Sequence, residues 1–229
     1  MTLQRIGGLA ALVCAATYLA GFALLVTWLA PLGYGTAEVD ARGVVDLVHA
    51  RPGILIAWNT TIYVVNALAL VVLVVALSER QAAVTPGWAA VTRAFGLIWA
   101  ALVLGAGMIA NIAVERAAPL HAADPQAAAD LWGILHAVEL GLGGGNEIAG
   151  GVWILCVGIA GLVGRGLARP VAILGVLTGV AGLVTILPAL GDAAGAVFGL
   201  GAIAWFLGVG AQLLSGTHPR PGMVGESGE

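Results

Sequence analysis

The chain has 229 residues, of which 60% are hydrophobic and only 9% are charged. A soluble domain carries about a quarter charged residues, so this composition excludes an ordinary soluble fold and indicates a membrane protein covered largely by lipid. The net charge of −3 without a basic patch excludes a nucleic-acid partner, and the absence of lysine excludes a lysine Schiff base of the retinal-pigment type.

Six apolar segments are long enough for a helix to cross a bilayer, which takes about 20 residues. They lie at residues 6–30, 53–78, 92–114, 145–164, 170–189 and 193–214. Inside lipid every backbone polar group must be paired, so each segment should be a helix. The first is too long for the apolar core of a signal peptide and is interpreted as a span. We predict an all-α bundle of six transmembrane helices in a single domain, residues 1–214, followed by a disordered cytoplasmic tail, residues 215–229.

Two connections are long, residues 31–52 and 115–144, and each should contain a short amphipathic helix over the outer mouth of the bundle. The second helix has a clear start, with Asp124 as N-cap and Pro125 in the first turn. The glycines of GLGGGNE (141–147) should end it and form a hinge or a close helix crossing. An anion site there is disfavoured because Glu147 would repel a phosphate. The alternative is one long kinked helix over residues 126–164.

The arginines are divided unequally between the two sides of the predicted bundle. The side with both termini holds Arg5, Arg80, Arg93, Arg165, Arg169 and Arg220. The opposite side holds Arg42, Arg51 and Arg116. Because cytoplasmic loops carry the excess of positive charge, we expect both termini in the cytoplasm of a bacterium, with the protein in its plasma (inner) membrane.

Polar side chains in the predicted spans are concentrated in the outer half of the membrane, where they are costly unless they face the bundle interior. The ligand-binding candidates are Asn59, Tyr63, Asn66, Asn111, Glu115 and Asn146. The first three are spaced i, i+4, i+7 and therefore share one helix face. The inner half is almost free of polar side chains, which predicts an outward-facing pocket with an apolar floor and argues against an ion channel. The alternative is that the stripe only joins helices.

Three ionisable residues, His136, Glu139 and Glu147, are candidates for catalysis. His136 and Glu139 are three residues apart on a predicted helix, a spacing that can place two ligands on one metal ion. His136 and Glu147 would serve as a general acid–base pair. His49 is the other histidine considered for a metal site, but no HExxH or CxxC pattern is present, and we predict no metal ion and no cofactor. The alternative is that these groups only bond to one another and hold the loops in place.

Glycines recur at helical spacing near the end of the chain. Gly175 and Gly179 form a GxxxG pair, and Gly191, Gly195 and Gly199 form a ladder into the last predicted helix. Small residues allow membrane helices to approach closely. Packing within one chain is the simpler interpretation, and a homodimer or a complex with another membrane protein is the alternative.

Two segments, GLGGGNEIAGGVWIL (141–155) and LPALGDAAGAVFGLGAIAWFLGVG (187–210), resemble an uncharacterised bacterial multi-pass membrane family known as domain of unknown function 4386. The opening RIGGLAALVCAATYLAGF (5–22) is similar in style. The resemblance implies a compact helical membrane bundle. It brings no assigned activity and no catalytic residues.

These patterns lead to one main hypothesis, a protein surrounded by membrane lipids that binds a small molecule or lipid in an outward-facing polar pocket. The first alternative is an outer-leaflet enzyme that uses histidine and glutamate for acid–base or metal chemistry. The second is a non-catalytic partner subunit of a membrane complex. Transport is less favoured, because the sequence has no convincing inverted repeat and its clearest helix break is expected near the surface.

Overall fold

The computed structural model describes residues 1–34, 36, 38–144 and 147–216, and within these residues it is helical without strands. The α-helices are α1 (Leu3–Leu24), α2 (Ala41–Ala50), α3 (Pro52–Asn59), α4 (Asn66–Ala82), α5 (Pro86–His121), α6 (Pro125–Glu139), α7 (Ile148–Gly164), α8 (Arg169–Val184) and α9 (Gly191–Ser215). Shorter helical turns lie at Leu25–Leu29, Ala30–Leu32, Thr60–Val65, Leu140–Gly144 and Pro188–Leu190. Most of the predicted tail, residues 217–229, lies outside the described residues.

Five helical stretches of the described chain are long and apolar enough to cross a membrane, which confirms the prediction of a helical membrane protein. They are Leu3–Leu32, Pro52–Ala82, Pro86–His121, Pro125–Gly164 and Pro188–Ser215. The predicted segment 170–189 forms α8, an apolar helix of 16 residues that is shorter than a usual span.

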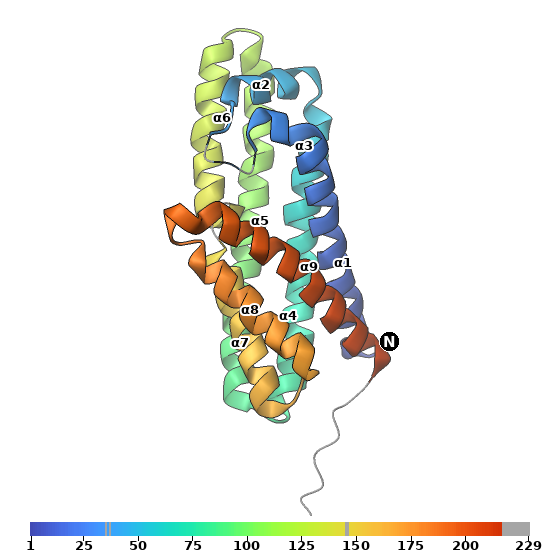
Figure 1. Cartoon of the computed structure of the whole chain (residues 1–229). Coiled ribbons are helices and arrows are strands. Elements are labelled where there is room, and N and C mark those ends of the chain that lie inside the picture. Colours follow the sequence, from blue (N-terminus) through green and yellow to red (C-terminus); the bar gives the residue numbers. More distant parts are fainter. Residues whose placement is uncertain (35, 37, 145–146, 217–229) are drawn as a thin grey trace, which may run out of the picture.

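The long helices run side by side along one axis, and α8 and α9 cover only the half of the bundle near residue 1 (Figure 1). We call this half the N-terminal end. The opposite half carries α2 and the α5–α6 turn, and we call it the cap end. In Figure 1 the start of α1 and the end of α9 lie together at the N-terminal end. Close contacts of Gly8 with Leu214 and of Gly199 with Phe22 fix α9 antiparallel to α1.

The predicted long connection at residues 115–144 is mostly helical. α5 continues to His121, and α6 begins at Pro125 after a short turn and packs back along α5. The alanines on both sides of the turn favour helix, which explains why the loop is shorter than predicted. Asp124 is confirmed as N-cap, because its Oδ1 accepts hydrogen bonds of 3.0 Å from the backbone N–H groups of Gln126 and Ala127.

A break interrupts the helical stretch between α6 and α7. The chain forms one wide turn over Leu140–Gly144, and Gly143 adopts φ 134° and ψ 11°, a conformation that L side chains rarely adopt. The sequence suggested a break near the end of the bundle, but the break lies farther inside. Leu142 lies next to Gly105, at the middle of α5. The kinked-helix alternative over residues 126–164 thus describes this region better than a separate loop helix.

The GxxxG pair is used for packing within the chain. A side chain at Gly179 would collide with Leu155 of α7, and a side chain at Gly175 would collide with the indole of Trp205 in α9. Gly195 of α9 is different, because a Cβ added there would meet no other atom within 4 Å. The small residues of α8 therefore allow it to pack closely between α7 and α9.

A buried aromatic cluster fills the bundle where α5, α7 and α9 meet. Trp99, Trp153, Trp205 and Phe206 are at most 2% exposed. The ring centroids of Trp99 and Trp153 are 5.5 Å apart, and those of Trp153 and Trp205 are 5.4 Å apart. Close-packed rings of this kind leave little room for water. They form an apolar layer inside the bundle.

The N-terminal end is more polar inside than the sequence suggested. Gln4 Nε2 donates to the carbonyl oxygen of Ala76 at 2.9 Å, and the buried Thr92 hydroxyl donates to Gln81 Oε1 at 2.8 Å. Glutamine and threonine do not interrupt an apolar run strongly, so their contribution to helix contacts is easily overlooked in the sequence. These bonds join helices at the N-terminal end of the bundle.

α2 lies across the cap end. Its residues Val44, Val45 and Val48 are buried against α5 and α6, and Arg42 and Asp46 on the other face are exposed. The helix begins at the N-cap Asp40, whose Oδ1 accepts from the backbone N–H of Gly43 at 3.0 Å. Its apolar stripe therefore anchors the segment that connects α1 to α3.

Candidate functional site

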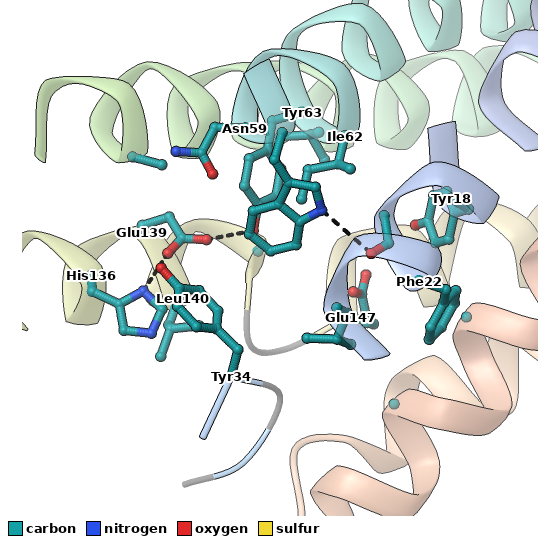
Figure 2. A pocket seen from close by; sticks show the side chains of 18 of the residues that line it. Tyr18, Phe22, Tyr34, Asn59, Ile62, Tyr63, His136, Glu139, Leu140 and Glu147 are labelled. Atoms are coloured by element: carbon teal, nitrogen blue, oxygen red, sulfur yellow. Dashed lines mark hydrogen bonds and ion pairs between the residues drawn. The ribbon is translucent and has the colours of Figure 1, made fainter. Parts of the chain in front are cut away.

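A cavity of about 650 Å³ lies at the middle of the molecule, between α1, the α3–α4 stretch, α5, α6 and the start of α9. Pockets for small molecules are typically about 300–1,000 Å³. Its aromatic lining residues are Tyr18, Phe22, Tyr34, Trp58, Tyr63, Trp99 and Trp132. Its acidic lining residues are Glu139, Glu147 and Asp192. Figure 2 shows the labelled side chains converging on this space from several helices.

Most of the residues singled out in the sequence line this one cavity. Those that do are Asn59, Tyr63, Asn66, His136, Glu139 and Glu147. They come from two distant parts of the chain, the α3–α4 stretch and the region around the α6–α7 break. Three candidates lie elsewhere, and Asn146 lies outside the described residues.

Glu139 is held by two partners. The Tyr63 hydroxyl donates to its Oε1 at 2.5 Å, and Nδ1 of His136 lies 2.7 Å from its Oε2 (Figure 2). The His136 ring stacks on Trp132 with centroids 4.6 Å apart and planes inclined by 18°. The Glu139 side chain is therefore buried, bonded on both oxygens and fixed in orientation.

Tyr34 contributes to the lining from the connection between α1 and α2. Its ring lies against Trp58, Trp132 and His136, with centroid distances of 5.7, 5.9 and 5.6 Å. Burial raises the pKa of Tyr34 well above its usual range, and the charge of Glu139 raises it further. The phenol is therefore protonated at neutral pH and can donate a hydrogen bond.

The Asn59/Tyr63/Asn66 stripe serves two purposes. Asn66 is buried and its Nδ2 donates to Thr17 Oγ1 at 2.7 Å, so it joins α4 to α1. Asn59 is 5% exposed, lines the cavity and makes no side-chain hydrogen bond to another described residue. Asn66 therefore makes a helix contact, and Asn59 faces the cavity.

Glu147 enters the cavity from the other side of the helix break. Its backbone N–H donates to Thr185 Oγ1 at 3.0 Å, which ties the start of α7 to the end of α8. Its side chain lies beside Tyr18 and Phe22 (Figure 2). Within the described part of the chain its carboxylate accepts no hydrogen bond, in contrast to that of Glu139.

The three remaining candidates are separated from the cavity. Asn111 joins α5 to the wide turn after α3, because its Nδ2 donates to Thr60 Oγ1 at 3.1 Å. Glu115 is exposed on the surface of α5. His49 lies at the cap end, where its ring stacks on His121 with centroids 4.6 Å apart. Helical spacing placed these side chains on a face but could not show which neighbour covers it.

His49 and His136 do not share a site. His121 Nε2 bonds to Asp46 Oδ1 at 2.7 Å, and Nδ1 of His49 lies 3.2 Å from the carbonyl oxygen of Ala118, so this cluster fastens α2 to α5. Among the described residues no group of three or more His, Cys, Asp or Glu side chains could hold a metal ion.

Most of the aromatic residues that line the cavity were not identified as site residues from the sequence. Tyr18 and Phe22 are four residues apart on α1, and Trp58 directly precedes Asn59 on α3. This spacing was visible in the sequence as a helical face, but aromatic residues in membrane helices are commonly simple packing residues. Tyr34 stands in a connection and carried no periodic signal.

No family model, curated protein or solved structure matches this chain. The resemblance to domain of unknown function 4386 therefore stays a prediction.

Proposed function

We propose that this protein is a six-span bacterial inner-membrane protein that binds a small molecule or lipid in its central cavity. The observation that carries the proposal is the convergence of Asn59, Tyr63, His136, Glu139 and Glu147 on one space of about 650 Å³. Polar and ionisable side chains are expensive inside a membrane and normally mark a functional site. A purely structural network would not require an open volume of this size.

The sixth pass is α8, which returns the chain from the N-terminal end to the middle of the bundle before α9 descends. The arginines support a cytoplasmic N-terminal end. That end carries Arg5, Arg80, Arg93, Arg165 and Arg169, and the cap end carries Arg42, Arg51 and Arg116. With this orientation the cavity and the cap end face the outer side of the membrane.

A cavity-filling substitution tests the proposal. Gly195 lines the cavity and a Cβ there meets open space, so Gly195→Leu should occupy the volume without disturbing α9. Gly133→Leu is the matched control, because Gly133 is also helical and open but does not line the cavity. Leucine is the better helix former, so both variants should fold.

The measurement is thermal unfolding in mild detergent with three amphipathic probes that share a phenylalkyl group, trimethyl(4-phenylbutyl)ammonium, 4-phenylbutanol and 4-phenylbutyrate. A ligand that binds the folded state raises the melting temperature by mass action. We expect at least one probe to stabilise the parent protein and Gly133→Leu, and none to stabilise Gly195→Leu. No stabilisation of the parent protein, or an unchanged effect in Gly195→Leu, would contradict a ligand cavity.

A second candidate function is favoured by the Tyr63–Glu139–His136 arrangement. A histidine held by a carboxylate is a common general base, and His136 faces the cavity. The protein would then be an outer-leaflet enzyme. Elemental analysis of purified protein tests whether such an enzyme uses a metal ion. The metal-dependent form of the hypothesis is contradicted if no stoichiometric metal is found and if His136→Ala behaves like the parent protein.

A further inference from the structure

We propose that the ligand is an amphipathic organic cation, whose positive group is held between the carboxylate of Glu147 and the aromatic walls of the cavity. This inference rests on the proposed ligand-binding function and assigns the chemical class of the ligand. It is carried by the charge of the lining, by the rings around Glu147 and by the composition of the cavity mouth.

The cavity lining is acidic. Glu139, Glu147 and Asp192 contribute carboxyl groups, and no arginine is among the described residues that line it. Glu139 is already bonded by Tyr63 and His136. Glu147 is the acid beside the rings of α1 whose oxygens accept no hydrogen bond from the described residues, so a negative charge on it has no partner unless a ligand supplies a positive one.

The rings beside Glu147 suit a cation. Tyr18 and Phe22 of α1 lie next to it (Figure 2), and Trp99 lines the same cavity. The faces of aromatic rings attract ammonium groups, and the attraction is largest where water is displaced. The Trp58 indole N–H donates to the carbonyl oxygen of Gly21 at 3.3 Å, which fixes another ring of the wall. Aromatic walls with a carboxylate are a recognised way to bind substituted ammonium ions.

The mouth of the cavity indicates that the ligand also has an apolar part. Four lining residues, Thr36, Pro188, Asp192 and Ala196, are exposed and mark where the cavity opens. The turn between α8 and α9, directly beside Asp192, carries Ile186, Leu187 and Leu190, which are 64%, 50% and 49% exposed. Exposed apolar side chains of a membrane protein face lipid. A molecule that enters past this turn must tolerate both lipid and the acidic lining.

The ammonium group could belong to a free amphipathic cation or to the headgroup of an ethanolamine lipid. The acidic lining favours the free cation. A phospholipid would bring its phosphate close to Glu147, where the described lining has no arginine to balance it and its histidine, His136, is already bonded to Glu139. The same three acids would repel an anionic ligand.

The test compares the affinities of the three probes, which share a phenylalkyl group and carry a cationic, a neutral or an anionic headgroup, by quenching of tryptophan fluorescence, since Trp58, Trp99 and Trp132 line the cavity. We expect trimethyl(4-phenylbutyl)ammonium to bind about tenfold or more tightly than 4-phenylbutanol, and 4-phenylbutyrate to bind weakest. Equal affinity for the alcohol and the ammonium ion would overturn the cation assignment and leave the ligand cavity intact. If none of the three binds, the proposed function itself fails.

Variants of Glu147 assign the preference to this residue. Glu147→Gln should remove most of the preference for the cation over the alcohol, and Glu147→Asp should keep it. Glu115→Gln is the matched control, because it removes a carboxylate that is exposed on α5 outside the cavity. Loss of the preference in Glu115→Gln would show that the selectivity arises from overall charge, and its retention in Glu147→Gln would overturn the assignment to Glu147.

Competition with lipids identifies the source of the cation. Mixed micelles with phosphatidylethanolamine or with phosphatidylglycerol are added to the protein loaded with trimethyl(4-phenylbutyl)ammonium. We expect neither lipid to displace the probe. Selective displacement by phosphatidylethanolamine would overturn the assignment to a free cation and place a lipid headgroup in the cavity.

Discussion

Two glutamates reach the cavity from opposite sides of one helix break, and their surroundings differ. Glu139 belongs to the last turn of α6 and is bonded by Tyr63 and His136. Glu147 precedes the first turn of α7 and has rings beside it in place of hydrogen-bond donors. The first carboxyl group thus holds helices together, and the second is the one that we propose to contact a ligand.

The Tyr63–Glu139 hydrogen bond should contribute to stability. Tyr63→Phe removes the donor to a buried carboxylate, and bonds to charged groups are worth about 1.5–3 kcal/mol, so we expect destabilisation of that size. Tyr18→Phe is the matched control, because the Tyr18 hydroxyl has no hydrogen bond within the described residues. Thermal unfolding in detergent compares the two, and an equal melting temperature for both variants would contradict this role of Tyr63.

At the scale of secondary structure, the α6–α7 break allows both glutamates to face one space. An uninterrupted helix would place residues 139 and 147 about two turns apart along its axis and about 80° apart around it, whereas here both line the same cavity. The break depends on Gly143, the one described residue of this segment with a positive φ.

Alanine substitutions in the break should separate backbone conformation from packing. Gly143→Ala places a Cβ on a residue with φ 134°, and we expect a cost of about 1–3 kcal/mol although no atom lies within 4 Å of the new Cβ. Gly141→Ala, two residues earlier and equally open, should be neutral or slightly stabilising. The measurement is the free energy of unfolding of both variants. An unchanged free energy of unfolding in Gly143→Ala would mean that the break does not require glycine.

Much of the helical structure could be predicted from the sequence, because apolar length and capping are local signals. The stretches beginning near residues 6, 53 and 92 and the Asp124 N-cap were found in this way. The position of the α6–α7 break along the bundle could not be predicted in this way. Glycines show where a helix is interrupted, but they do not show which part of a neighbouring helix the interruption contacts.

The candidate site could be predicted in part for a related reason. Tyr63 and Glu139 were visible as polar residues in apolar surroundings, a costly arrangement that attracts attention. Asn111 and Glu115 gave the same signal, yet one binds Thr60 and the other is exposed. Side-chain type identifies a candidate, but only the packing of α5 against its neighbours decides which candidates meet.

For the whole molecule, the distribution of charge distinguishes the two ends. The cap end carries exposed acids, among them Glu38, Asp40, Glu115 and Asp124. The N-terminal end carries most of the arginines. A field of this sign would concentrate cations near the cap end at low ionic strength.

The orientation in the membrane can be measured with single cysteines. Ala123 and Ala83 are both exposed in turns, at the cap end and the N-terminal end respectively. On intact cells we expect a membrane-impermeant maleimide to label Ala123→Cys but not Ala83→Cys, and to label both after the cells are opened. The parent protein, with Cys14 buried and Cys156 partly buried, controls for the native thiols. The reverse pattern would invert the proposed orientation.

The unequal lengths of the helices have a consequence for the surrounding lipid. α5 has 36 residues and extends about 54 Å, whereas α8 has 16 and extends about 24 Å, less than the thickness of a bilayer's hydrocarbon core. Lipid adjusts to a short apolar surface by thinning. We therefore expect an asymmetric annulus, with the outer leaflet depressed beside α8. Such a depression would bring water and headgroups down to the level of Asp192 and shorten the path between the aqueous phase and the cavity.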